Sequence, residues 1–202
     1  MKANKFIKTT TVSIILSALL IGCGSSSDSN EFNGDDSLES NIPYLKQNHA
    51  NYSEHGSDRT PAPTKDANKK SIDWLISATS KEGSKKLAEH IQYMVGQLQV
   101  GQNPRAFDKL FLMEAYMKVN HYYTTSVERD GTTVIISKNA TTSCAYDVIS
   151  AHSDAVSGDF FGKGDTDNDY SSIAEGILAS ASCSSEKVSI ESYINDKQES
   201  RN

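Results

Sequence analysis

The most constraining feature of this 202-residue sequence is its N-terminus, where a short basic segment precedes an uncharged apolar run. Residues 1–8, MKANKFIK, contain three lysines and no acid, and residues 9–22, TTTVSIILSALLIG, contain no charge. This pattern predicts a signal peptide. A permanent membrane-spanning helix needs about 20 apolar residues, and this run is shorter, begins with threonines and has no basic cluster behind it. We therefore expect residues 1–22 to be removed on export.

The apolar run ends in Leu20-Ile21-Gly22-Cys23, which resembles the lipobox of bacterial lipoproteins. That motif consists of a branched apolar residue, a small or apolar residue, a small residue and then cysteine. The resemblance implies that Cys23 is thioether-linked to diacylglycerol, that the signal is cut before it, and that its freed amine can be acylated. Several acyl chains together make a stable membrane anchor. The alternative is an ordinary secretory signal that ends in cysteine.

The residue after the cysteine indicates where such an anchor is retained. In enteric bacteria an aspartate at this position keeps lipoproteins in the inner membrane, whereas this sequence has Gly24. The resemblance thus implies a lipid-anchored protein of the cell envelope, in the outer membrane of a Gram-negative organism that follows this rule. The membrane is then a partner through the lipid on Cys23.

The charge of the chain restricts its other partners. The formal net charge is −6, and the signal peptide contributes +3 of it, so the remainder carries −9. Nucleic acids and anionic lipid surfaces are bound by clustered Lys and Arg. We therefore expect no nucleic-acid partner.

The two cysteines that remain after Cys23, Cys144 and Cys183, form an even pair. Extracytoplasmic compartments are oxidising, so this pair predicts a disulfide. A reactive thiol or half of a metal site are the alternatives, but neither cysteine has a CxxC partner or a histidine at ligand spacing.

The composition changes near residue 69. Residues 23–68 are rich in Ser, Asn, Asp and Gly, with apolar residues at no fixed period, and such a segment predicts a disordered tether. The exception is Ile42-Pro43-Tyr44-Leu45, an apolar patch that can dock on the domain or on a partner. Residues 69–202 are expected to form a single globular domain, a size that suits one core.

The first half of this domain is predicted to be helical. Ile72, Leu75 and Ile76 follow helical spacing behind Ser71, and Trp74 lies beside them. A second apolar face, ended near Gly101, comprises Leu87, Ile91, Met94, Val95 and Leu98. A third helix is predicted to start at Asn103 as its cap, with Pro104 in the first position.

The second half changes period. Residues 124–129 and 132–137 are rich in β-branched residues and flank Asp130-Gly131, which predicts a β-hairpin with a type I′ turn. Residues 145–156 have helical spacing, Ser172 to Glu175 resembles a capping box, and residues 188–194 fit a strand or a helix. The predicted class is therefore α+β: a mostly helical small domain with one hairpin and a disulfide, behind a disordered N-terminal tether.

Catalytic motifs give no assignment. The sequence lacks G-x-S-x-G, H-E-x-x-H and G-x-x-x-x-G-K-[ST], which would indicate an α/β-hydrolase, a zinc protease and a nucleotide-binding loop. Of the histidines, His152 lies on an apolar helical face, where a hydrogen-bonded core histidine is expected. No catalytic residue is predicted, and whether the protein is an enzyme stays open, with a non-enzymatic role favoured.

The acidic loop before the last helices is the candidate metal site. Asp165, Asp167 and Asp169 alternate as in calcium loops of the form D-x-[DN]-x-[DN]-G. Tyr170 stands where that pattern has glycine, and Glu175 falls one place short of the bidentate position. These residues predict a weak calcium site, with calcium as the only cofactor considered. The alternative is a solvated loop.

These features predict a membrane-anchored envelope lipoprotein that acts as a non-enzymatic binding or assembly factor for another envelope component. One alternative is a periplasmic or surface hydrolase of cell-wall or exogenous polymer. Another is a calcium-dependent adhesion module.

Overall fold

The computed structural model describes residues 62–78, 80–103, 105–161 and 168–200. Within these ranges the chain forms a four-stranded antiparallel sheet and five α-helices, so the predicted α+β class is confirmed. The strands are β1 (Thr64–Asp66), β2 (Ser71–Ser77), β3 (Tyr123–Asp130) and β4 (Thr133–Ala140). The α-helices are α2 (Lys81–Gln99), α3 (Lys109–Val119), α4 (Ser143–Val156), α5 (Ser171–Leu178) and α6 (Lys187–Glu199). A π-helical turn, η1 (Ser157–Phe161), continues α4, and a short 3₁₀ helix, η2 (Ala181–Cys183), precedes α6.

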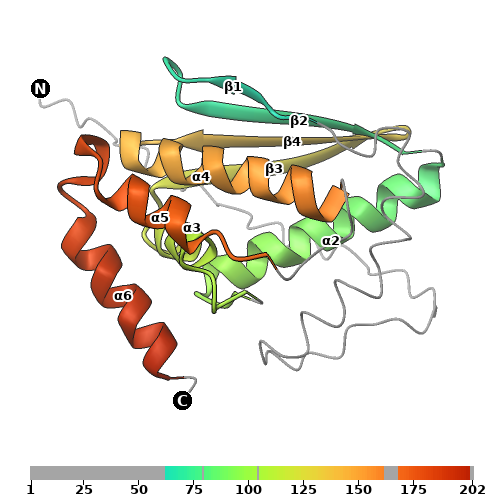
Figure 1. Cartoon of the computed structure of the whole chain (residues 1–202). Helices are drawn as coiled ribbons and strands as arrows, with labels where there is room; N and C mark the ends of the chain where they lie inside the picture. The colour runs from blue at the N-terminus through green and yellow to red at the C-terminus, as the bar shows by residue number, and fades with distance from the viewer. Residues whose placement is uncertain (1–61, 79, 104, 162–167, 201–202) are drawn as a thin grey trace, which may run out of the picture. The chain divides into compact units, whose positions relative to one another are not determined.

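The sheet has the strand order β1-β2-β4-β3, and the helices lie on one side of it (Figure 1). Alternate residues of a strand point to opposite faces of the sheet, so the sheet has an inner and an outer face. The inner face packs on α2 and α4. The buried apolar residues that β2 and β4 contribute to the inner face are Ile72, Trp74, Ile76, Val134 and Ile136. Leu75, between them on β2, points outward and is 61% exposed.

The helix predicted from Ile72, Leu75 and Ile76 is wrong, because these residues form strand β2. Burial there follows a period of two: Ile72, Trp74 and Ile76 are buried, whereas Leu75 is exposed. Because Leu75 lies three residues after Ile72 and next to Ile76, it gives these apolar residues an apparent helical spacing. Pairing of the whole of β2 with β4 decides the conformation, since tertiary contacts override a short apolar pattern.

Strand β1 lies ahead of residue 69, where the folded part was expected to begin. It pairs with β2 through Thr64 opposite Asp73, and Lys65 reaches α4, where its Nζ lies 2.6 Å from Asp154 Oδ2 and 3.1 Å from the Ser150 carbonyl oxygen. The sheet therefore includes residues assigned to the tether. Residues 1–61, including the predicted signal peptide, lie outside the described residues.

Helix α2 is confirmed, and Ser80 caps it by accepting a hydrogen bond from the Gly83 amide at 2.9 Å. The predicted start of α3 is wrong. The helix begins at Lys109, and Asp108 caps it by accepting from the Leu110 amide. Asn103 instead accepts from the Arg105 amide and donates to the Phe111 carbonyl. It thus stabilises the turn that precedes the helix.

The predicted hairpin is confirmed, but its turn lies one residue further along. Asp130 pairs with Thr133 as the last rung of the ladder, so Gly131 and Thr132 connect the strands. Gly131 has a φ of 59°, whereas the φ of Thr132 is not positive. A glycine with positive φ at the first central position is typical of a type II′ turn rather than a type I′ turn.

The C-terminal elements are all helical. Helix α4 is confirmed, and Thr142 caps it. The predicted capping box at Ser172–Glu175 is wrong, because α5 begins at Ser171 and the Glu175 carboxylate lies 2.5 Å from Lys109 Nζ. Residues 188–194, which fitted a strand or a helix, belong to α6.

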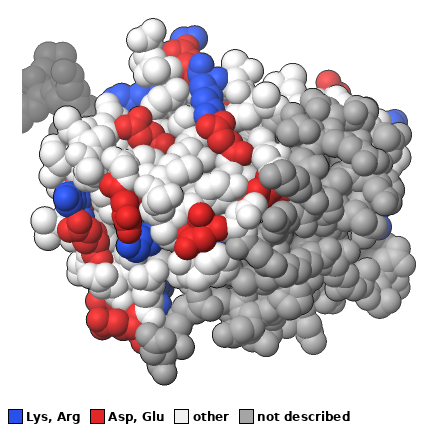
Figure 2. All heavy atoms as spheres, viewed as in Figure 1, with Lys and Arg blue, Asp and Glu red and all other residues white. Residues whose placement is uncertain are grey.

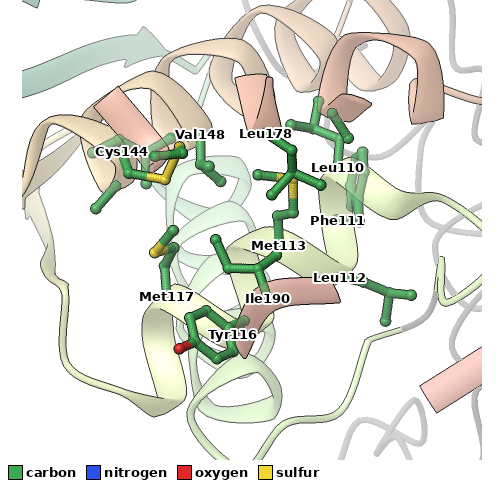
Figure 3. Packing of buried hydrophobic residues seen from close by; sticks show 14 of the residues in the cluster. Leu110, Phe111, Leu112, Met113, Tyr116, Met117, Cys144, Val148, Leu178 and Ile190 are labelled. Carbon is green, nitrogen blue, oxygen red and sulfur yellow. A yellow bond between two sulfur atoms is a disulfide. The ribbon is translucent and has the colours of Figure 1, made fainter. Parts of the chain in front are cut away.

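The disulfide between Cys144 and Cys183 joins the start of α4 to η2. Their Cα atoms lie 4.6 Å apart and both residues are fully buried, so the predicted pairing is confirmed. Around it, side chains of α3, α4, α5 and α6 meet in the main core, as Figure 3 shows for Met113, Val148, Leu178 and Ile190. The bond therefore fixes the C-terminal helices against the layer that covers the sheet.

Removing this disulfide should destabilise the domain. The cysteines are 39 positions apart, and a loop of that length corresponds to about 4 kcal/mol in the chain-entropy model. The variant Cys144→Ala/Cys183→Ala should have a lower Tm than the wild type in thermal unfolding followed by circular dichroism. Reductant should lower the wild-type Tm and leave that of the variant unchanged, and equal Tm values for both proteins would contradict this role.

Candidate functional site

A group of buried ionisable side chains gathers around the carboxylate of Glu114, which lies on α3 and is fully buried. Its Oε1 lies 2.6 Å from Lys138 Nζ and accepts a 3.0 Å hydrogen bond from the Tyr123 hydroxyl. Its Oε2 lies 2.8 Å from His152 Nε2. We call Glu114, Lys138, His152 and Tyr123 the buried cluster. It joins α3, β4, α4 and β3.

The local structure explains why these side chains meet. On β4 the inward positions alternate, so Lys138 follows Val134 and Ile136 into the interior. Helix α3 is buried on nearly all sides, which leaves Glu114 no route to solvent. Lys138 Nζ also lies 5.7 Å from the ring centroid of Trp74 and equally far from that of Tyr123. Aromatic faces attract cations at such distances.

The charges within the cluster compensate one another. Burial opposes ionisation of Glu114, but His152 and Lys138 outweigh it and hold the pKa of this carboxyl well below its usual range. Burial and the neighbouring Glu114 carboxylate raise the pKa of the Tyr123 hydroxyl well above 10. Burial lowers the pKa of His152 below 6.5, and although Glu114 opposes this effect, Lys138 adds to it. At neutral pH the cluster is thus an ion pair of Glu114 and Lys138 with a neutral imidazole.

A second buried group of charges surrounds Arg105, just ahead of α3. Its guanidinium nitrogens lie 3.3 Å from Asp108 Oδ2 and 3.8 Å from Asp159 Oδ2, and it donates to the Asn168 carbonyl oxygen. The same guanidinium lies 4.1 Å from the ring centroid of Phe111, against which His152 packs edge-on at 4.5 Å. The two groups of charges therefore share one aromatic ring.

The arrangement of the buried cluster suits support rather than catalysis. A general base needs a nitrogen within reach of the substrate proton. In His152, Nε2 faces Glu114 and Nδ1 lies 3.5 Å from Lys138 Nζ, so both ring nitrogens are engaged inside the protein. His152 is 8% exposed and Lys138 is 6% exposed. Buried networks of this kind fix the relative positions of the elements that carry them.

The residues that the sequence predicted as sites are only partly described. Cys23, Asp165 and Asp167 lie outside the described residues. Asp169 is exposed, and its Oδ1 accepts a 2.9 Å hydrogen bond from the Ser171 amide at the start of α5. A hydrogen bond from the Ser171 side chain, together with the one from its amide, lowers the pKa of Asp169. In the described part of the chain no group of three or more His, Cys, Asp or Glu residues could hold a metal ion, and the calcium site stays a prediction.

His152 was expected to be a hydrogen-bonded core histidine, and that is its position. Its partners Glu114 and Lys138 were not singled out. One signal in the sequence could have found them: each is a lone charge in an otherwise apolar inward pattern, Glu114 in the run from Leu110 to Met117 and Lys138 after two inward apolar residues. Such charges are buried only when paired.

Comparisons with protein-family models, with curated protein sequences and with solved structures gave no significant match. In the described ranges, no helix is both long and apolar enough to cross a membrane.

Neutralising the central carboxylate should strongly destabilise the domain. In Glu114→Gln, Lys138 stays buried without its counterion, and breaking a buried pair typically costs about 3–5 kcal/mol. Urea unfolding at neutral pH measures the free energy of unfolding. The matched control is Glu175→Gln, which removes a carboxylate that is 60% exposed from its pair with Lys109, and we expect it to cost less than about 1 kcal/mol. Similar losses in both variants would contradict a central role for Glu114.

Proposed function

We propose that this protein is a lipid-anchored protein of the cell envelope whose α+β domain binds another envelope component. The observation that carries the anchor is the sequence Leu20-Ile21-Gly22-Cys23 at the end of an uncharged run behind a lysine-rich start. An anchored domain with a disulfide and a net negative charge suits a role as an accessory factor beside a membrane. A second argument for this role comes from the outer face of the sheet, which is described below.

The lipid anchor has a direct test. Mass spectrometry of the protein from its native membrane should show loss of residues 1–22 and an acylated Cys23. Cys23→Ser should leave an unprocessed precursor, because the processing that the lipobox implies requires the thioether. The control Ser27→Ala, four residues later, should be processed normally. Mature protein that lacks lipid would contradict the anchor.

The outer face of the sheet is the surface we assign to the partner. Leu75, 61% exposed, lies at its centre. The register places Ile135 of β4 opposite Leu75, and Glu128 of β3 opposite Ile135. Ile135 is half-buried and Glu128 is exposed. The helices occupy the other side of the sheet (Figure 1). An apolar centre with a polar surround is typical of surfaces that bind proteins.

The charge distribution favours a protein partner over nucleic acid. On the described part of the face in Figure 2, Lys and Arg side chains lie beside Asp and Glu rather than gathering in a basic patch. The described ion pairs Lys85–Glu89, Lys109–Glu175 and Lys187–Glu191 are examples of this mixing. The engagement of both nitrogens of His152 likewise favours binding over hydrolysis.

Site-specific photocrosslinking tests the assigned surface. A photoreactive phenylalanine analogue replaces Leu75 in the full-length protein, expressed in its native cells. The matched control carries the analogue at Val188, an apolar residue of α6 that is 78% exposed. We expect a discrete adduct of higher mass from position 75 and none from position 188. An adduct from position 188 alone, or from neither position, would contradict the assignment.

A further inference from the structure

Three side chains of the buried cluster bind α3, β4 and α4 together at one point. Glu114 comes from α3, Lys138 from β4 and His152 from α4. Each contacts the other two: the Glu114 carboxylate lies 2.6 Å from Lys138 Nζ and 2.8 Å from His152 Nε2, and Lys138 Nζ lies 3.5 Å from His152 Nδ1. A change at any one of them therefore affects all three elements.

These contacts select one protonation state of His152. A neutral imidazole donates from one nitrogen and accepts at the other. Nε2 faces a carboxylate, so it carries the hydrogen, whereas Nδ1 faces an ammonium, so it carries the lone pair. A second proton would be added at Nδ1 and would point at Lys138. Two like charges would then lie next to each other, away from solvent.

The surroundings offer little compensation for that extra charge. The ionisable groups around His152 on the elements that pack with α4 are Glu114 and Lys118 of α3, Arg105 and Asp108 ahead of α3, Tyr123 of β3, Lys138 of β4 and Asp159 of η1. The Glu114 carboxylate already neutralises Lys138. Asp108 and Asp159 both pair with Arg105.

The more distant carboxylates on these elements either pair with other cations or point away from His152. Asp154 on α4 pairs with Lys65 of β1, and Glu175 on α5 pairs with Lys109. Asp73 of β2 lies on the outer face, because its neighbours Ile72 and Trp74 point inward. The carboxylate nearest to His152 is thus the one already shared with Lys138.

We propose that the contact of Glu114, Lys138 and His152 is an acid-sensitive switch: uptake of a proton by His152 Nδ1 breaks its contact with Lys138 and loosens the packing of α4 against α3 and β4. No bond other than the N–H of the imidazolium forms, and the proton comes from solvent. This device belongs to the domain and does not depend on the proposed anchor or partner surface.

The sign of the pH dependence follows from His152. Its pKa is below 6.5 in the folded domain, so between that pKa and 6.5 the unfolded or loosened state binds more protons. Stability is therefore fully present above about pH 6.5 and declines as the pH falls toward the folded-state pKa. Protonation of Glu114 adds nothing in this window, because its pKa lies well below the usual range.

A second histidine must be separated from this effect. Burial lowers the pKa of His90 to about 4, so His90 also destabilises the domain in acid. It lies on α2, however, whereas His152 lies on α4. Amide protection measured separately in α2 and α4, together with a variant at each histidine, therefore distinguishes the effect of His90 from that of His152.

Nuclear magnetic resonance titration of the full mature protein tests the protonation state directly. We expect neutral His152 to carry its hydrogen on Nε2 and to titrate below pH 6.5. Amide exchange, corrected for the intrinsic rate at each pH, should show protection in α4 falling through that titration by up to about tenfold per pH unit, the limit for uptake of one proton. A hydrogen on Nδ1, a midpoint at or above pH 6.5, or unchanged protection in α4 would overturn the proposal.

Two variants sharpen the test. His152→Gln keeps an amide donor for Glu114 and a carbonyl acceptor for Lys138 but cannot be protonated, so its α4 protection should fall less steeply through this window than that of the wild type, and the part that remains belongs to His90. His90→Gln is the matched control and should keep the part of the α4 response that His152→Gln removes. If His152→Gln responds to acid as the wild type does, the switch is not at His152.

Lys138→Gln should weaken the response to acid. Without the ammonium, His152 pairs with Glu114 alone and its midpoint should rise above that of the wild type, so that α4 loses less protection on acidification than in the wild type. A midpoint that stays at the wild-type value would overturn the role of Lys138. Should any variant fail to fold, the wild-type titration still decides the proposal.

Discussion

The buried carboxylate of Glu114 is the interaction on which the arrangement of the domain depends. A charge without solvent must be paired, and this one is paired by groups from β4 and α4 together with the hydroxyl of Tyr123. Apolar packing alone tolerates small shifts of a helix over a sheet. An ion network with fixed hydrogen-bond directions does not, so Glu114 sets the position of α3 relative to the sheet and to α4.

The disulfide and the charges around Arg105 fix further parts of the domain relative to one another near α3. Arg105 orients Asp108, which caps α3, and its guanidinium covers Phe111. Cys183 ties the segment before α6 to α4. The outer face of the sheet, with Leu75 near its centre, thus lies over helices that are held together by these contacts. Fixed helices of this kind suit the partner surface that we propose.

Local patterns in the sequence predicted the parts of the fold that local chemistry decides. The hairpin, α2, α4 and the cysteine pair could all be predicted, because turn residues, apolar periods and thiol parity suffice for them. Strand β2 could not, since the outward Leu75 imitates a helical spacing that only pairing with β4 overrules. The candidate site could not be assembled either. Glu114, Lys138 and His152 come from three elements, and the sequence gives no information about which elements meet.

The pairing of β2 with β4 has a consequence for how the chain folds. Ser71 lies opposite Asn139, with α2, α3 and β3 between them in sequence. The central rungs of the sheet therefore cannot form until most of the domain has left the ribosome, and domains ruled by such distant contacts fold slowly. The nascent chain remains without its core through most of synthesis at about 5–20 residues per second.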